Sequence, residues 1–162
     1  MIINPFQSIL SWFKHNDVGI HSHSEISELS YKHKEKKEDP SIFYTKQFER
    51  FALENIEIWR KMIEDWVIIG DILVVHFEDV VRHRMREIER ILDFLKIEKN
   101  EDKQACLKYC NVDMYKRKPM KLERSPYTAK LRSIIYDSVK KVDSILVEFG
   151  HSGIPYSKYT VD

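Results

Sequence analysis

The sequence predicts an α/β fold that is rich in helix and contains only part of a parallel sheet. Two short apolar segments, residues 1–3 and 72–77, have the composition of buried strands, and helical apolar periodicity lies between and after them. Strands that alternate with helices indicate a parallel sheet covered by helices. Because a strand as short as residues 1–3 is not stable alone, we expect an upstream portion of the sheet to be absent.

Composition fits one folded domain, residues 1–162. Charged residues make up 33% of the chain and aromatic residues 12%, and the formal net charge is +1, which gives no reason to predict nucleic-acid binding. The first residues do not show the charged segment, apolar stretch and cleavage site typical of a signal peptide, and no apolar run approaches the roughly 18 residues of a membrane span. Cys106 and Cys110 form neither a disulfide framework nor a zinc site, and we interpret them as a free buried pair in a short helix, 101–110.

The first helix is predicted over residues 5–15. Asn4 is a favoured N-cap and Pro5 a favoured first helical residue, and Phe6, Ile9, Leu10 and Phe13 follow at helical spacing. The polar segment 16–41 is predicted to be a mobile loop. Its histidines, His21 and His23, have no fixed third ligand, so solvation is favoured over a metal site.

A second helix is predicted over residues 41–67. Its expected buried stripe is Phe48, Ala52, Trp59, Met62 and Trp66. The tryptophans Trp12, Trp59 and Trp66 are interpreted as core or interface residues. Gly70-Asp71 ends this helix, and the strand 72–77 follows.

A third helix is predicted to begin after Glu78-Asp79, with an apolar stripe of Val81, Met85, Ile88, Leu92 and Leu95. A basic loop, 115–124, precedes the last helix, in which Ser125 is the expected N-cap and Pro126 the first residue. The apolar stripe of that helix is Leu131, Ile135, Val142, Ile145 and Phe149, and Gly150 ends it. The tail 151–162 is predicted to be extended.

Several stretches, in this order and spacing, carry a family resemblance over nearly the whole chain. They are Asn4-Pro5-Phe6, Val74-Val75-His76-Phe77-Glu78-Asp79, Ile91-Leu92-Asp93-Phe94-Leu95, Tyr115-Lys116-Arg117, Lys121-Leu122-Glu123, Ser125-Pro126-Tyr127-Thr128-Ala129 and Gly153-Ile154-Pro155-Tyr156. The chain resembles the sulfotransferases that use 3′-phosphoadenosine 5′-phosphosulfate, and is most similar to the C-terminal part of the WSC-domain-containing group. The resemblance implies a P-loop-like domain and sulfuryl transfer to an acceptor hydroxyl or amine.

The resemblance also implies site residues. Relatives bind the 3′-phosphate of the nucleotide with an Arg-Asn-Pro motif, a Ser eight residues after that Arg, and a late basic loop. Here Asn4-Pro5 and Ser11 match, but Ile3 stands at the Arg position. The late loop supplies Arg117 and Lys118, with Pro119 where many relatives have Gly. Phe77 and Tyr115 stand where adenine-contacting aromatic residues are expected.

For each of these residues a simpler role stays open. Ser11 is either a phosphate ligand or a helix-surface serine, and Arg117 and Lys118 are either phosphate ligands or part of a solvated loop. His76 is interpreted as a core histidine rather than a catalytic base, and Glu78-Asp79 as helix-capping groups rather than catalytic carboxylates.

The resemblance places the phosphosulfate loop, its Lys and the catalytic base upstream of Met1, so we expect the chain alone to be inactive and to bind nucleotide weakly or not at all. The relatives imply a Golgi membrane location in the secretory pathway and a carbohydrate or protein acceptor. The alternative is a non-catalytic interaction protein built on the same scaffold. Nothing in the sequence identifies the acceptor or the oligomeric state.

Overall fold

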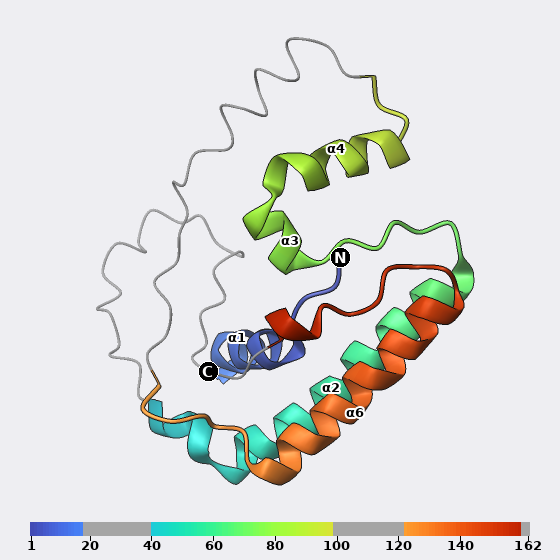
Figure 1. The fold of residues 1–162 in the computed structure, drawn as a ribbon. Helices are drawn as coiled ribbons and strands as arrows, with labels where there is room; N and C mark the ends of the chain where they lie inside the picture. The colour runs from blue at the N-terminus through green and yellow to red at the C-terminus, as the bar shows by residue number, and fades with distance from the viewer. Residues whose placement is uncertain (18–39, 99–121, 160–162) are drawn as a thin grey trace, which may run out of the picture.

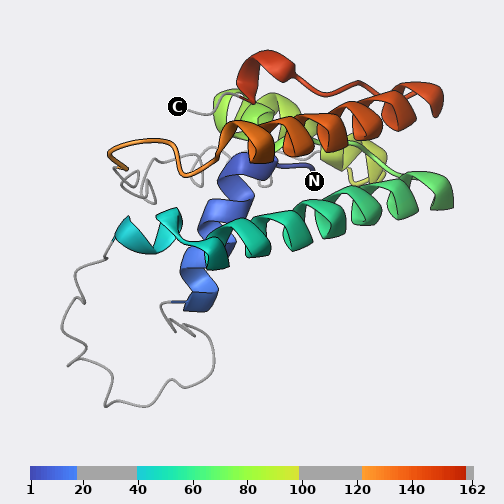
Figure 2. The ribbon, with the colours of Figure 1, turned by 90° about the horizontal axis from the view of Figure 1, so that it is seen from below.

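Two long helices lie side by side in the computed structural model, which describes residues 1–17, 40–98 and 122–159 (Figure 1). They are α2, Lys46–Ile69, and α6, Ala129–Glu148, and both views show them running in the same direction (Figure 2). Helix α1, Pro5–Asp17, crosses them. The 3₁₀ helix η2, Pro40–Tyr44, leads into α2.

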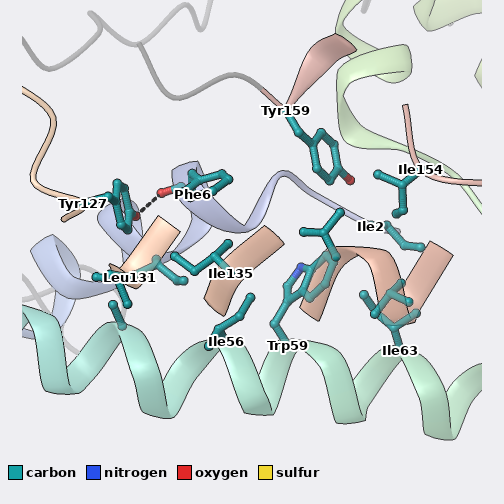
Figure 3. Close-up of a cluster of buried hydrophobic side chains, with 14 of the residues drawn as sticks. Ile2, Phe6, Ile56, Trp59, Ile63, Tyr127, Leu131, Ile135, Ile154 and Tyr159 are labelled. Atoms are coloured by element: carbon teal, nitrogen blue, oxygen red, sulfur yellow. Dashed lines mark hydrogen bonds between the residues drawn. The ribbon is translucent and has the colours of Figure 1, made fainter. Parts of the chain in front are cut away.

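The core lies between α1, α2 and α6 (Figure 3). Its buried apolar residues from these helices are Phe6, Ile9, Phe13, Phe48, Ala52, Ile56, Trp59, Ile63, Val67, Leu131, Ile135, Val139, Val142 and Leu146. Tyr127 closes one end, where its hydroxyl donates to the carbonyl oxygen of Phe6 at 2.5 Å. Burial of the phenol raises the pKa of Tyr127 well above its ordinary value, so this hydroxyl keeps its proton.

Threonine side chains cap the starts of both long helices, α2 and α6. Helix α2 starts at Lys46 because the hydroxyl of Thr45 accepts the Phe48 N–H, at 3.2 Å. Helix α6 is capped in the same way by Thr128, not by Ser125, so the predicted start at Ser125-Pro126 is wrong. The predicted ends are confirmed, since Gly70 and Gly150 follow the helices with positive φ angles of 77° and 78°.

Three predicted core residues lie at the surface. Met62, Trp66 and Trp12 are 48%, 61% and 58% exposed, whereas Trp59 is buried. The buried residues of α2 are instead Ile63 and Val67, which directly follow Met62 and Trp66.

The single helix predicted after the strand is two helices, α3, Phe77–Arg82, and α4, Arg84–Phe94, separated at His83. Neither contains a buried apolar residue, and the buried residue of α4 is Glu87. Val81 and Leu95, from the predicted apolar stripe, are exposed, and Phe149, predicted in the buried stripe of the last helix, is also exposed. No helix among the described residues is long and apolar enough to span a membrane.

The C-terminal tail returns from the end of α6 toward the N-terminal segment and α3 (Figure 1). It includes a short 3₁₀ helix, η3, Tyr156–Lys158, and buries Ile154 and Tyr159 in the core. Gly153 permits a close approach to α6, because a Cβ atom there would lie 2.5 Å from the Oδ1 atom of Asp143.

Candidate nucleotide-binding edge

The two predicted strand segments lie side by side and parallel, joined by a bridge between Ile2 and His76. The Ile2 N–H donates to the Val75 carbonyl at 2.8 Å, and the Phe77 N–H donates to the Ile2 carbonyl at 2.8 Å. Among the described residues the pairing extends no further, so the predicted strand 72–77 takes part only through this bridge. Because the two segments are parallel, their carboxyl ends lie side by side, and the starts of α1 and α3 therefore meet there. We call this end of the paired segments the edge.

Asn4 holds the start of α1 at this edge. Its side-chain oxygen accepts the Phe6 N–H at 3.0 Å and its carbonyl accepts the Ser8 N–H at 3.0 Å, which confirms the predicted Asn4-Pro5 helix start. Its own N–H donates to the Oε1 atom of Glu78, the second residue of α3, at 2.9 Å. The two helix starts are therefore joined directly.

Ser11 lies on the exposed side of α1, which it shares with Ser8 and His15, away from the buried Phe6 and Ile9. Seven residues separate it from Asn4, which places it about 10 Å further along the helix axis. Ile3, at the position where relatives have Arg, brings no charge, and its carbonyl accepts a hydrogen bond from the indole of Trp59 at 3.1 Å.

Phe77 is the first residue of α3 and is half-buried. The preceding residue, His76, is buried. Burial lowers the pKa of His76 against the opposing effect of Asp79 and Glu78, which favours the neutral ring. This supports the interpretation of His76 as a core histidine, but the ring was predicted to have its hydrogen bonds satisfied, and neither nitrogen has a partner among the described residues.

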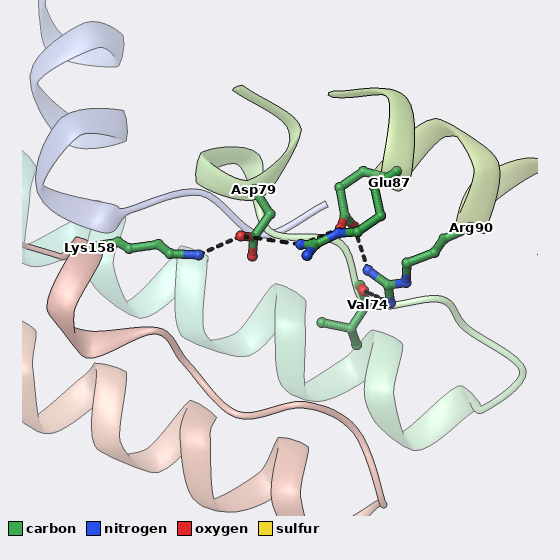
Figure 4. A network of polar contacts seen from close by, with 6 residues as sticks. Val74, Asp79, Glu87, Arg90 and Lys158 are labelled. Carbon is green, nitrogen blue, oxygen red and sulfur yellow. Dashed lines mark hydrogen bonds and ion pairs between the residues drawn. The ribbon is translucent and has the colours of Figure 1, made fainter. Parts of the chain in front are cut away.

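Asp79 and Glu87 bind basic side chains from two parts of the chain, the tail and α4 (Figure 4). Lys158 of the tail contacts Asp79, and the Arg86 guanidinium lies 3.9 Å from the same carboxylate. The hydrogen bond from Lys158 lowers the pKa of Asp79. Glu87 contacts Arg86 at 3.1 Å and also Arg90, whose Nη2 atom donates to the Val74 carbonyl at 3.4 Å.

A group of buried polar atoms near this edge has no hydrogen-bond partner in the part of the chain that the structure describes. They are Asn4 Nδ2, His76 Nδ1, His76 Nε2, Glu78 Oε2 and Tyr159 OH. The edge is thus a polar part of the interior.

A family model for the sulfotransferase domain matches residues 1–138. The chain belongs to this family. A WSCD family member of Drosophila melanogaster, CG9164, is 30% identical over 103 residues, which are 62% of this chain and 32% of that protein. The WSCD family member GA21586 of Drosophila pseudoobscura pseudoobscura is 29% identical over 103 residues, which are 62% of this chain and 33% of that protein. No solved structure matches the chain.

The chain spans about a third of the length of the curated relatives that it matches. Of its predicted nucleotide contacts, Ser11 and Phe77 lie on helices that start at one edge. Tyr115, Arg117 and Lys118 lie outside the described residues, so a phosphate site shared by Ser11 and the late loop stays a prediction. No group of three possible metal ligands occurs in the described ranges.

Two contacts of this sulfotransferase edge were not predicted, Glu78 with Asn4 and Lys158 with Asp79. A partial signal exists, because acidic residues directly after a buried strand mark a helix start that needs polar partners. Nothing local identifies those partners, which lie 74 and 79 residues away in the sequence.

Proposed function

We propose that this chain supplies part of the nucleotide-binding surface of a sulfotransferase domain that uses 3′-phosphoadenosine 5′-phosphosulfate. In the complete reaction the bond between sulfur and the bridging oxygen of the phosphosulfate breaks, and sulfur bonds to an acceptor hydroxyl or amine. The acceptor proton passes to a base, and 3′-phosphoadenosine 5′-phosphate leaves. Residues 1–162 contain no Gly-rich phosphate loop, so we expect these residues alone not to complete the transfer.

The observation that carries the proposal is the parallel bridge between Ile2 and His76. Ligands of open α/β sheets bind outside the carboxyl ends of parallel strands. The bridge brings the starts of α1 and α3, the helices that carry Ser11 and Phe77, to this position. Ser11 then offers a hydroxyl to the 3′-phosphate, and Phe77 offers an aromatic surface to the adenine.

The late loop is the second part of this proposal. Arg117 and Lys118 would contribute positive charge to the 3′-phosphate, and Tyr115 a second aromatic surface. Affinity is expected to be low, because Ile3 replaces the planar fork of donors with which an Arg binds phosphate.

The same Ile3 favours a second candidate function, a non-catalytic interaction protein that keeps the scaffold. The carbohydrate or protein acceptor and the Golgi location are proposals that rest on the resemblance alone. The two functions differ in one measurable property, the affinity for 3′-phosphoadenosine 5′-phosphate.

The decisive experiment restores the missing charge. The chain and its Ile3→Arg variant are titrated with 3′-phosphoadenosine 5′-phosphate by calorimetry. We expect weak binding by the original chain and roughly 10- to 100-fold tighter binding by Ile3→Arg, because a hydrogen bond to a charged group contributes about 1.5–3 kcal/mol. Adding Ser11→Ala should remove part of this gain.

Ile58→Arg is the matched control, since it adds the same charge at a position of α2 that is 61% exposed. It should leave the affinity unchanged. A folded Ile3→Arg variant that binds no better than Ile58→Arg would exclude the nucleotide-binding proposal and favour the interaction protein.

A further inference from the structure

The first turn of α3 is anchored by polar contacts and not by burial. This six-residue helix, Phe77–Arg82, has no buried residue. Its start is held by the Phe77 N–H on Ile2, by Glu78 on the Asn4 N–H, and by Asp79 on Lys158. The loss of one of these contacts is therefore expected to loosen the turn that carries Phe77.

Lys158, by contrast, stands on a well-anchored segment. Its neighbour Tyr159 is 1% exposed, and Ile154 is also in the core. The Ile154 N–H donates to the Asp143 carboxylate at 2.6 Å, and the Tyr156 hydroxyl donates to the other oxygen of Asp143 at 3.1 Å. The tail is thus fixed to α6 independently of α3.

The ion pair itself is sheltered from solvent. The Lys158 and Asp79 side chains are 21% and 18% exposed, and Figure 4 shows Lys158 reaching from the tail to the start of α3. Sheltered pairs are screened less by salt and water than surface pairs. The hydrogen bond from Lys158 also lowers the pKa of Asp79, so the carboxylate stays charged at neutral pH.

We infer that Lys158 is a positioning residue for the candidate nucleotide site, acting through Asp79 to fix the first turn of α3 and with it Phe77. Lys158 lies outside residues 1–138, which the family model matches. The inference rests on the proposed function, because it assigns Phe77 to the nucleotide. The inference means that the tail, which lies beyond the residues that the family model matches, contributes to the candidate nucleotide site.

The test compares Lys158→Met with Lys140→Met. Lys140 also forms an ion pair, with Asp137 at 3.7 Å, but both side chains of that pair are largely exposed on α6. Two quantities are measured for each variant. The first is the amide hydrogen exchange rate of residues 77–82, and the second is the dissociation constant for 3′-phosphoadenosine 5′-phosphate.

For Lys158→Met we expect about fivefold faster amide exchange in α3 and about fivefold weaker nucleotide binding. Lys158→Arg keeps the positive charge and should have the exchange rate and the affinity of the original chain. In a Phe77→Ala background, Lys158→Met should no longer change the affinity, because Lys158 acts through that ring. Lys140→Met should change neither quantity. Asp79→Asn should reproduce the effect of Lys158→Met.

Unchanged exchange in α3 overturns the inference whether or not nucleotide binds. Faster exchange with unchanged affinity also overturns it, since α3 would then move without consequence for the site. If the original chain and Ile3→Arg both fail to bind nucleotide, the proposed function fails, and the exchange measurement still decides whether Lys158 holds α3 in place.

Discussion

The α2–α6 pair and the α3–α4 region differ in what holds them to the rest of the molecule. Between α2 and α6 the contact consists of apolar side chains such as Ile56 and Ile135, both 0% exposed. In α3 and α4 no apolar residue is buried, and the contacts are hydrogen bonds and ion pairs around Asp79 and Glu87.

This difference determines how each region responds to change. Apolar burial is non-directional and does not depend on the charge of any group. An ion pair depends on its partner and on pH, and a buried charge that loses its partner is destabilising. The candidate nucleotide edge lies next to the polar region, so its geometry is expected to be the more sensitive of the two.

The largest effect is expected from Ile56→Ala in the apolar contact. The substitution leaves a cavity between α2 and α6, and the free energy of unfolding should fall by about 2–5 kcal/mol. Urea unfolding followed by circular dichroism measures this loss. Ile58→Ala, on the same helix but 61% exposed, is the control and should stay within about 0.5 kcal/mol of the original chain. Equal losses in both variants would show that α2 does not pack as described.

A smaller effect is expected from Arg90→Met in the polar region. It leaves the buried Glu87 with Arg86 as its remaining ionic partner, and should cost about 2 kcal/mol, measured by the same unfolding experiment. Because an apolar pair needs no charge compensation, the double variant Glu87→Met with Arg90→Met should recover part of the loss.

The control for this pair is Arg50→Met. Arg50 pairs with Glu54 on α2, where the two side chains are 83% and 58% exposed, so its loss should leave the free energy of unfolding unchanged. The free energy of unfolding of the double variant could instead fall at least as far as that of Arg90→Met alone. That result would mean that the region does not depend on the charge of Glu87.

Elements stabilised by local contacts could be predicted from the sequence. The Asn4-Pro5 helix start and the glycines that end α2 and α6 are examples, because each depends on residues within one helical turn. The buried side of α2 was predicted only partly. From Trp59, both Met62 and Ile63 lie at helical spacing, and only the position of α6 determines which of them is buried.

Contacts between distant segments could not be predicted in this way. The contact of Glu78 with Asn4 and that of Lys158 with Asp79 each join residues more than 70 positions apart. No periodicity connects such pairs, since they form only after the parallel bridge and the returning tail have placed the segments. The family resemblance, by contrast, was predicted and is confirmed, because its motifs are short and local.

The smallest effect is expected from His76→Phe, which tests the polar region through pH. The folded-state pKa of His76 is lowered by burial, whereas the unfolded chain takes up its proton near pH 6.5. Between the folded pKa and about 6.5 the unfolded state binds more protons, so stability rises with pH across this window and gains nothing more from His76 above it. His76→Phe should flatten this slope between pH 5 and pH 8. At pH 8 it should cost little, because neither ring nitrogen has a partner among the described residues. Urea unfolding of the original chain and of His76→Phe at pH 5, 6, 7 and 8 measures the slope. A slope that persists in His76→Phe would assign the pH dependence to another group.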